Sequence, residues 1–116
     1  MSLIEAIKKQ IEAKQEWKDQ MKRVKSLPQE YQVVFKEMQN YLFQFASGDG
    51  MDTVKGIYDL LEMFEEAAAN NISVLEFTGE DVGEFAENYR RSIGAKHWTD
   101  DLKTKMEENI KNKLNK

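Results

Sequence analysis

Carboxylates are the residues of this sequence best suited to chemistry, and most of them lie in one central stretch. They are Asp52, Asp59, Glu62, Glu65 and Glu66, followed by Glu80, Asp81, Glu84 and Glu87. Hard divalent cations prefer oxygen ligands, so such a cluster could hold a metal ion or meet a basic partner. Carboxylates at helical spacing are also typical of a solvated helix face. Docking against a basic helix of the same chain is a third explanation, and we predict no metal site.

A glycine-rich turn at residues 47–52 could be half of a calcium loop or a phosphate-binding turn. A calcium loop that began at Ser47 would need a bidentate glutamate at its twelfth position, which is Tyr58. The lysine and hydroxyl of a phosphate-binding loop are absent. Gly48 and Gly50 readily adopt the left-handed conformation that closes a helix, so the turn is predicted to connect two helices.

The single histidine, His97, has no second metal ligand nearby and no serine or cysteine arranged for nucleophilic catalysis. The chain has no cysteine, which excludes disulfides and thiolate sites. We therefore predict that the protein is not an enzyme: it has no catalytic, cofactor-binding or metal-binding residues and no identified small-molecule substrate. Trp98, beside the histidine, is expected either to anchor the last helix or to contact a partner.

Charge is segregated along the 116 residues, with a net +3 over residues 1–26, −10 over 27–90 and +3 over 91–116. The pattern suggests that oppositely charged segments pack or dock together. The total of −4 argues against nucleic-acid binding, which depends on cations that displace phosphate counterions. With 41% apolar and 33% charged residues, the chain has the composition of one globular domain, residues 1–116.

No apolar run approaches the roughly 20 residues that span a bilayer. The first residues also lack the basic start and apolar stretch of a secretory signal. We expect a cytoplasmic protein with no membrane attachment.

Apolar residues at three- and four-residue spacing predict an all-α protein. Ser2 and Glu5 form a capping box that begins the first helix. This helix carries two apolar stripes about 100° apart, which are Ile4, Ile7 and Ile11, then Trp17, Met21 and Val24. We expect the helix to bend or split near residues 12–16. Whether the Ile4, Ile7 and Ile11 stripe packs within the chain or between subunits stays open.

A second helix is expected from Ser26, its cap or near-cap, with Pro28 in its first turn, to Gly48 and Gly50. A third helix, capped by Asp49 or Asp52, has so wide an apolar arc that it should be central, with Leu61 and Phe64 buried. Only a narrow ridge of this helix is expected to face water. The ridge consists of Asp52, Lys55, Asp59, Glu62 and Glu66.

The remainder of the chain is predicted to form a short helical turn and two further helices. Ser73 and Glu76 form the capping box of the short turn, and Thr78 caps a helix that stops at Gly94. Thr99 opens the last helix. Its apolar stripe is Leu102, Met106, Ile110 and Leu114.

Three stretches resemble a bacterial domain-of-unknown-function family of small cytoplasmic helical proteins, mostly from Gram-positive bacteria. They are Leu27-Pro28-Gln29-Glu30-Tyr31, Tyr41-Leu42 through Ser47-Gly48-Asp49-Gly50-Met51-Asp52, and Val74-Leu75-Glu76-Phe77-Thr78-Gly79-Glu80-Asp81-Val82. The resemblance covers nearly the whole chain. It implies a single domain of about five helices in a left-handed superhelical array rather than a closed bundle. It implies no established activity, although members are often encoded beside a PadR-type transcriptional regulator.

Some relatives carry a ferritin-like DNA-binding label, which this sequence does not support. Ferritin-type iron chemistry needs inward carboxylates and a Glu-x-x-His pair on facing helices. The residue three positions before His97 is Gly94, so that pair is missing.

We therefore predict a non-enzymatic protein–protein interaction module that contacts a transcriptional regulator or a second copy of itself. The candidate contact residues are Trp17, beside the basic residues of the first helix, Val33 and Phe43, off the main stripe of the second helix, and Trp98, between the last two helices. The alternative is direct nucleic-acid binding through the basic first and last helices. In the first helix the basic residues are Lys14, Lys18, Lys22, Arg23 and Lys25, and interspersed acids weaken their field.

Overall fold

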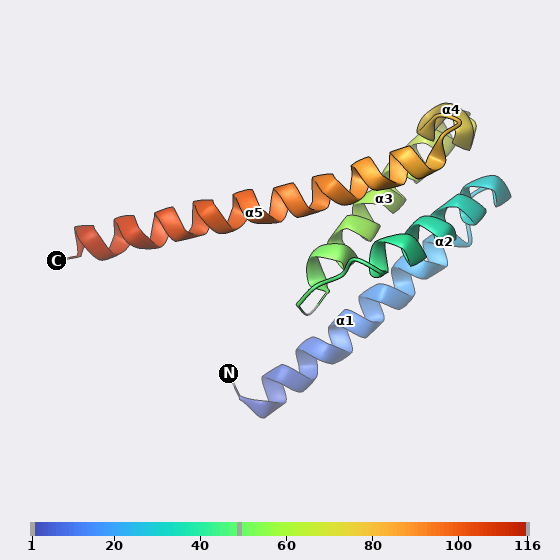
Figure 1. Ribbon diagram of the computed structural model, residues 1–116. Helices are drawn as coiled ribbons and strands as arrows, with labels where there is room; N and C mark the ends of the chain where they lie inside the picture. The colour runs from blue at the N-terminus through green and yellow to red at the C-terminus, as the bar shows by residue number, and fades with distance from the viewer. Residues whose placement is uncertain (1, 49, 116) are drawn as a thin grey trace.

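The computed structural model describes residues 2–48 and 50–115, apart from the side chains of His97 and Trp98, and within these ranges all regular structure is helical (Figure 1). The elements are α1 (Leu3–Val24), α2 (Gln29–Phe43), α3 (Met51–Ala69), α4 (Val74–Thr78) and α5 (Val82–Leu114). The central helix α3 packs against each of the other four.

Helix α1 begins where the capping box predicts, because the Ser2 hydroxyl oxygen accepts a hydrogen bond of 3.2 Å from the Glu5 amide. The predicted bend or split is wrong, since α1 runs unbroken through residues 12–16. These five residues are all strong or moderate helix formers, so nothing local interrupts the backbone. The two stripes differ instead in their surroundings: the second packs on the core and the first faces solvent.

Helix α5 also runs further than predicted. The expected stop at Gly94 and restart at Thr99 are wrong, and both residues lie inside one 33-residue helix. A glycine within a helix costs only about 1 kcal/mol relative to alanine. The Thr99 hydroxyl does not act as a cap but donates back to the Ala95 carbonyl at 3.0 Å.

Several predicted caps are displaced by a few residues. Thr78 closes α4 by donating to the Val74 carbonyl at 3.1 Å, and Asp81 caps α5 by accepting from the Glu84 amide at 3.0 Å. Pro28, rather than Ser26, occupies the cap position of α2.

At the start of α3 the cap position belongs to Gly50, with φ 76°, and Asp52 lies within the helix. Asp49, the other predicted cap, lies outside the described residues. Gly48 has the left-handed φ of 61° that was predicted for the turn. The capping box at the start of α4 is confirmed, because the Ser73 hydroxyl accepts from the Glu76 amide at 3.3 Å.

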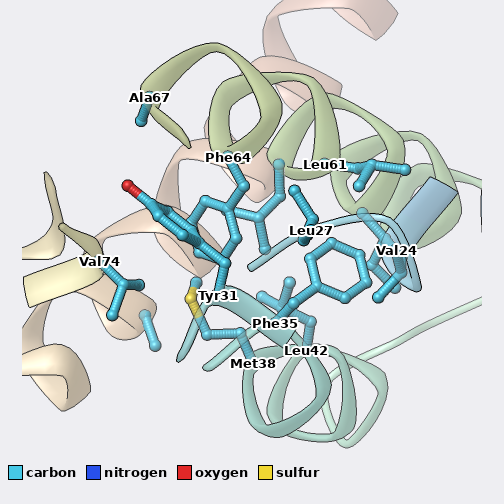
Figure 2. Packing of buried hydrophobic residues seen from close by; sticks show 13 residues of the cluster. Val24, Leu27, Tyr31, Phe35, Met38, Leu42, Leu61, Phe64, Ala67 and Val74 are labelled. Atoms are coloured by element: carbon cyan, nitrogen blue, oxygen red, sulfur yellow. The ribbon is translucent and has the colours of Figure 1, made fainter. Parts of the chain in front are cut away.

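The core lies between α2 and α3 and is centred on aromatic side chains (Figure 2). The Phe64 ring meets those of Tyr31, Phe35 and Phe77 edge-on at centroid distances of 5.2, 6.0 and 5.7 Å. Leu61 and Phe64 are completely buried, as predicted. The ridge of α3 is exposed at all five predicted positions, 52, 55, 59, 62 and 66.

The described chain is elongated, at 57 × 32 × 27 Å, with a radius of gyration of 17.6 Å. A compact domain of this length would have a radius of gyration of about 13 Å. The excess comes from two helix segments that project beyond the core (Figure 1). We name residues 3–16 of α1 the α1 arm and residues 102–114 of α5 the α5 arm.

Candidate interaction surface

Both arms carry apolar side chains that no part of the described chain covers. On the α1 arm, Leu3, Ile4, Ile7 and Ile11 are exposed, Ile4 by 67%. On the α5 arm, Leu102, Met106, Ile110 and Leu114 are exposed, and even the least exposed of them, Ile110, shows 48% of its surface. Contiguous exposed apolar surface on a soluble protein typically marks a site of interaction.

The two arms differ in charge. The α5 arm has four lysines and two glutamates, a net charge of +2: Lys103, Lys105, Lys111, Lys113, Glu107 and Glu108. The α1 arm balances three lysines with three glutamates: Lys8, Lys9, Lys14, Glu5, Glu12 and Glu16. Only the α5 arm is therefore a basic amphipathic helix.

A surface trough runs along α3, between α4 and the part of α5 that precedes the α5 arm. It consists of two hollows of about 340 and 240 Å³ that meet at Met63. Its apolar lining includes Gly56, Met63, Ala67, Ile72, Phe77 and Ile93, and its charged lining includes Asp52, Asp59, Glu66, Asp100, Lys55 and Lys96. The acids outnumber the lysines by four to two. We call this feature the α3 trough.

Tyr89 lies in the wall of the α3 trough and ties α5 to α3. Its hydroxyl donates to the Gly56 carbonyl at 2.6 Å. Burial, with a smaller contribution from Asp59, raises the pKa of Tyr89 to about 12. The hydroxyl therefore stays protonated at neutral pH, where it serves as a structural donor.

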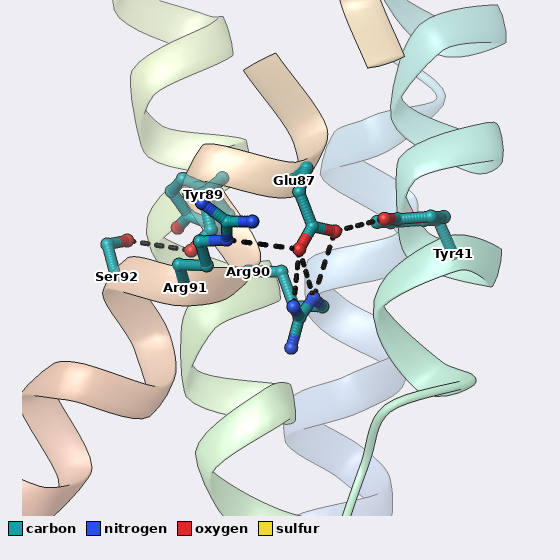
Figure 3. A network of polar contacts seen from close by, with 6 residues as sticks. All are labelled: Tyr41, Glu87, Tyr89, Arg90, Arg91 and Ser92. Atoms are coloured by element: carbon teal, nitrogen blue, oxygen red, sulfur yellow. Dashed lines mark hydrogen bonds and ion pairs between the residues drawn. The ribbon is translucent and has the colours of Figure 1, made fainter. Parts of the chain in front are cut away.

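Glu87 is the centre of a polar network that joins α5 to α2 (Figure 3). Its carboxylate accepts hydrogen bonds from the Tyr41 hydroxyl, from Arg90 Nε at 3.0 and 3.1 Å and from Arg91 Nε at 3.3 Å. The Arg90 guanidinium also lies over the Phe45 ring, 4.4 Å from its centroid. Because both oxygens of the Glu87 carboxylate accept hydrogen bonds, the network joins the two helices through a carboxylate that is fully occupied by donors.

The Glu87 network should make part of the protein's stability depend on acid pH. Hydrogen bonds from Arg90 and then Tyr41 lower the pKa of Glu87 from 4.5 to about 2. A lowered native pKa stabilises the fold above pH 4.5, and this contribution is lost as the pH falls from about 4.5 to 2. In thermal melts across that range, Glu87→Gln should show a smaller fall in Tm than the wild type. The exposed Glu108→Gln variant serves as the control and should follow the wild type; identical slopes for all three proteins would contradict this assignment.

One contact supports the idea that basic and acidic segments dock within the chain. The Arg23 guanidinium on α1 pairs with the Glu65 carboxylate on α3, with Nε at 3.1 Å. The other four basic residues proposed for nucleic-acid contact, at positions 14, 18, 22 and 25, are exposed. Of these five basic residues, only Arg23 therefore forms an ion pair with another part of the described chain.

The structure brings two of the four candidate contact residues together. Trp17 is half-buried, and its ring lies 5.8 Å from that of Phe43 and 6.1 Å from that of Tyr58. Phe43 is 39% exposed. Val33 is exposed on the same helix, about 15 Å along the axis from Phe43. Trp98 belongs to α5, but its side chain lies outside the described part of the structure.

Sequence reasoning missed the α3 trough and the exposure of the α5 arm. The α5 stripe is exposed because α5 continues beyond Ile93, the last of its described side chains that packs on the core. No local pattern in the sequence marks the point where a helix leaves its neighbours. The trough had no local sign either, because its lining comes from three helices.

Two absences hold within residues 2–48 and 50–115. No group of three or more His, Asp or Glu side chains there is arranged to hold a metal ion. No helix there is long and apolar enough to cross a membrane.

The fold places the molecule among all-α proteins whose helices pack in series. The chain belongs to the family described as "Protein of unknown function (DUF1048)", whose model matches residues 8–111. It is 43% identical to a DUF1048 protein from Bacillus cereus ATCC 10987, whose crystal structure is described as a left-handed superhelix fold. The TM-score is 0.60, and the match covers 66% of this chain and 94% of that chain. None of the curated proteins matches the sequence. The predicted fold, a left-handed superhelical array of about five helices, is thereby confirmed.

Proposed function

We propose that this protein is a non-enzymatic interaction module that binds another protein through its projecting arms. The observation that carries the proposal is the pair of amphipathic helix segments whose apolar stripes are uncovered in the described chain. A helix that lays its apolar face into a groove is a common mode of protein recognition. Burying each such side chain would contribute roughly 1.5–3 kcal/mol, so the stripes can supply substantial binding energy.

The polar groups inside the fold support a structural rather than a catalytic role. The Glu87 carboxylate is held by two arginines and a tyrosine, and the Tyr89 hydroxyl is bonded to a backbone carbonyl. General acid or base catalysis near neutral pH needs a group with a pKa close to 7. The pKa of Glu87 is about 2 and that of Tyr89 about 12, so neither meets that need.

We propose two kinds of protein partner, a transcriptional regulator and a second copy of this chain. The regulator is suggested by the PadR-type genes that often accompany the family this sequence resembles. A cytoplasmic location would let the protein meet such a regulator.

Affinity capture from native lysate tests this function when wild type and arm variants are compared. Wild type should retain a defined protein at a fixed ratio, identified by mass spectrometry. Ile7→Asp combined with Ile110→Asp should lose most of it, because each change puts a charge into an apolar stripe. Ala13→Asp combined with Asn112→Asp is the matched control, since it adds the same two side chains, with the same change of charge, at exposed positions outside the stripes of the same helices. Equal retention by all three proteins would refute binding through the stripes.

Direct nucleic-acid binding is a second candidate, favoured by the four exposed lysines of the α5 arm. The net charge of −4 opposes it. Binding through these lysines would weaken steeply as salt concentration rises. Absence of any shift of duplex DNA at low ionic strength would eliminate this candidate.

A further inference from the structure

We propose that the α3 trough receives the α5 arm of a second copy, so that two chains form a two-fold dimer with antiparallel α5 helices. The inference rests on the proposed function and names one partner and the surface to which that partner binds. Four observations carry it: the side of α5 on which each feature lies, their lengths, their charges and the exclusion of other occupants.

The distal part of the stripe and the α3 trough open on the same side of α5. Ser92 and Lys96 line the trough. Ile110 and Leu114 follow them by eighteen residues, which is five complete turns of an α-helix. Leu102 and Met106 lie further round the helix. Because the distal stripe and the trough share a side, one two-fold axis can place each stripe over the trough of the other copy.

The lengths of the two features agree. From Leu102 to Leu114 the stripe extends about 18 Å at 1.5 Å per residue. The part of α5 that lines the trough, from Tyr89 to Asp100, extends about 17 Å by the same measure. An antiparallel pair of α5 helices would thus bring the α5 arm alongside the larger hollow of the trough, with Ile110 and Leu114 facing it. A two-fold dimer makes this contact twice, which doubles the buried area.

The charges of the two features are opposite. The α5 arm carries a net +2. The charged lining of the trough has four carboxylates and two lysines, and the exposed Glu62 lies on the same helix. An apolar stripe with lysines beside it therefore meets an apolar trough with an excess of carboxylates.

Other occupants fit less well. The α5 arm cannot fold back into its own trough, because α5 is one unbroken helix that forms the trough wall and then leaves it. Two α5 arms packed together would bring net positive charges into contact. The α1 arm has no net charge to match the trough, and its stripe from Ile4 to Ile11 covers only about 10 Å.

Sedimentation equilibrium of the full chain gives the first test. The wild type should sediment as a dimer at high concentration and dissociate on dilution. Ile110→Asp with Leu114→Asp should raise the dimer Kd by more than about tenfold, because both side chains would be buried against the α3 trough of the other copy. Asn112→Asp, on the opposite side of α5 from Ile110 and Leu114, is the control and should keep a Kd within about threefold of wild type. A wild type that stays monomeric at every concentration would overturn the dimer.

Cross-linking locates the contact. Because the protein has no native cysteine, only the introduced cysteines can react with the cross-linker. Met63→Cys and Ile110→Cys are made in separate chains, mixed, and treated with a short bis-maleimide. Cross-linked dimers should form in the mixture and not with either variant alone. Cross-linking of Ile110→Cys with itself, or with Ile7→Cys in place of Met63→Cys, would show pairing between arms and overturn the assignment.

The outcomes also separate this inference from the proposed function. A monomer that still captures a different protein through the arms would overturn the dimer and leave the interaction module standing. Another possible result is a dimer for which the second copy is the only captured protein that the arm variants lose. That result would limit the function to self-association. A monomer that captures nothing would remove both.

Discussion

Phe64→Ala is expected to lower the free energy of unfolding by about 3–5 kcal/mol, which is the typical effect of removing a buried phenylalanine. Phe64 is completely buried, and its ring meets three other aromatic rings from α2 and α4 edge-on. Truncation would remove all three contacts and leave a cavity at the junction of these helices. Leu61→Ala, one turn earlier on the same buried face, should lower it by about 2–5 kcal/mol.

Urea denaturation followed by circular dichroism measures both changes. Asp59→Ala is the control on the same helix, because Asp59 is exposed and its replacement should change the free energy by less than about 0.5 kcal/mol. A loss as large for Asp59→Ala as for Phe64→Ala would show that the faces of α3 are wrongly assigned.

Gly56→Ala should lower the free energy of unfolding by about 1–3 kcal/mol, as does an added methyl group that forces a neighbouring side chain to move. Gly56 is buried on the side of α3 that faces α5, and its carbonyl accepts a hydrogen bond from the Tyr89 hydroxyl. A methyl group there would lie 2.9 Å from Ile93 Cγ1 and still closer to Cδ1. The clash would outweigh the gain of about 1 kcal/mol that alanine offers over glycine in a helix.

The sign of this effect should reverse when the obstructing side chain is removed. In an Ile93→Ala background, Gly56→Ala should stabilise the protein by up to about 1 kcal/mol, because only the helix-propensity gain remains. The two single variants and the double variant, compared in the same denaturation experiment, complete the cycle. Equal effects of Gly56→Ala in both backgrounds would mean that Ile93 is not the obstacle.

The sequence predicted the centre of the fold better than its ends. Leu61 and Phe64 could be placed in the core because a wide apolar arc on one helix leaves little choice about which face is buried. Gly94 and Thr99 were misread because local signals for ending and starting a helix are weak. One glycine is tolerated, and a threonine hydroxyl can bond to the carbonyl four residues earlier instead of capping.

The candidate surface was predictable only in part. The sequence showed the Ile4, Ile7 and Ile11 stripe. It left open whether the stripe packs within the chain or between subunits. Trp17 and Phe43 were named separately, but their ring contact depends on how α1 crosses α2 and α3. The Glu87 network joins residues 46 positions apart in sequence, and no local pattern indicates such a pairing.

The absence of tertiary contacts along the α5 arm has a consequence for how firmly its backbone is held. The arm continues a helix that the packed turns from Val82 to Ile93 have already nucleated, but without tertiary packing its own turns are expected to open more readily than those turns. We expect its amide protons to exchange with solvent faster than those of the packed turns, and a partner that docks on the arm would have to supply the free energy that orders it. The affinity of the α5 arm for a partner would then be thermodynamically linked to the helicity of the arm.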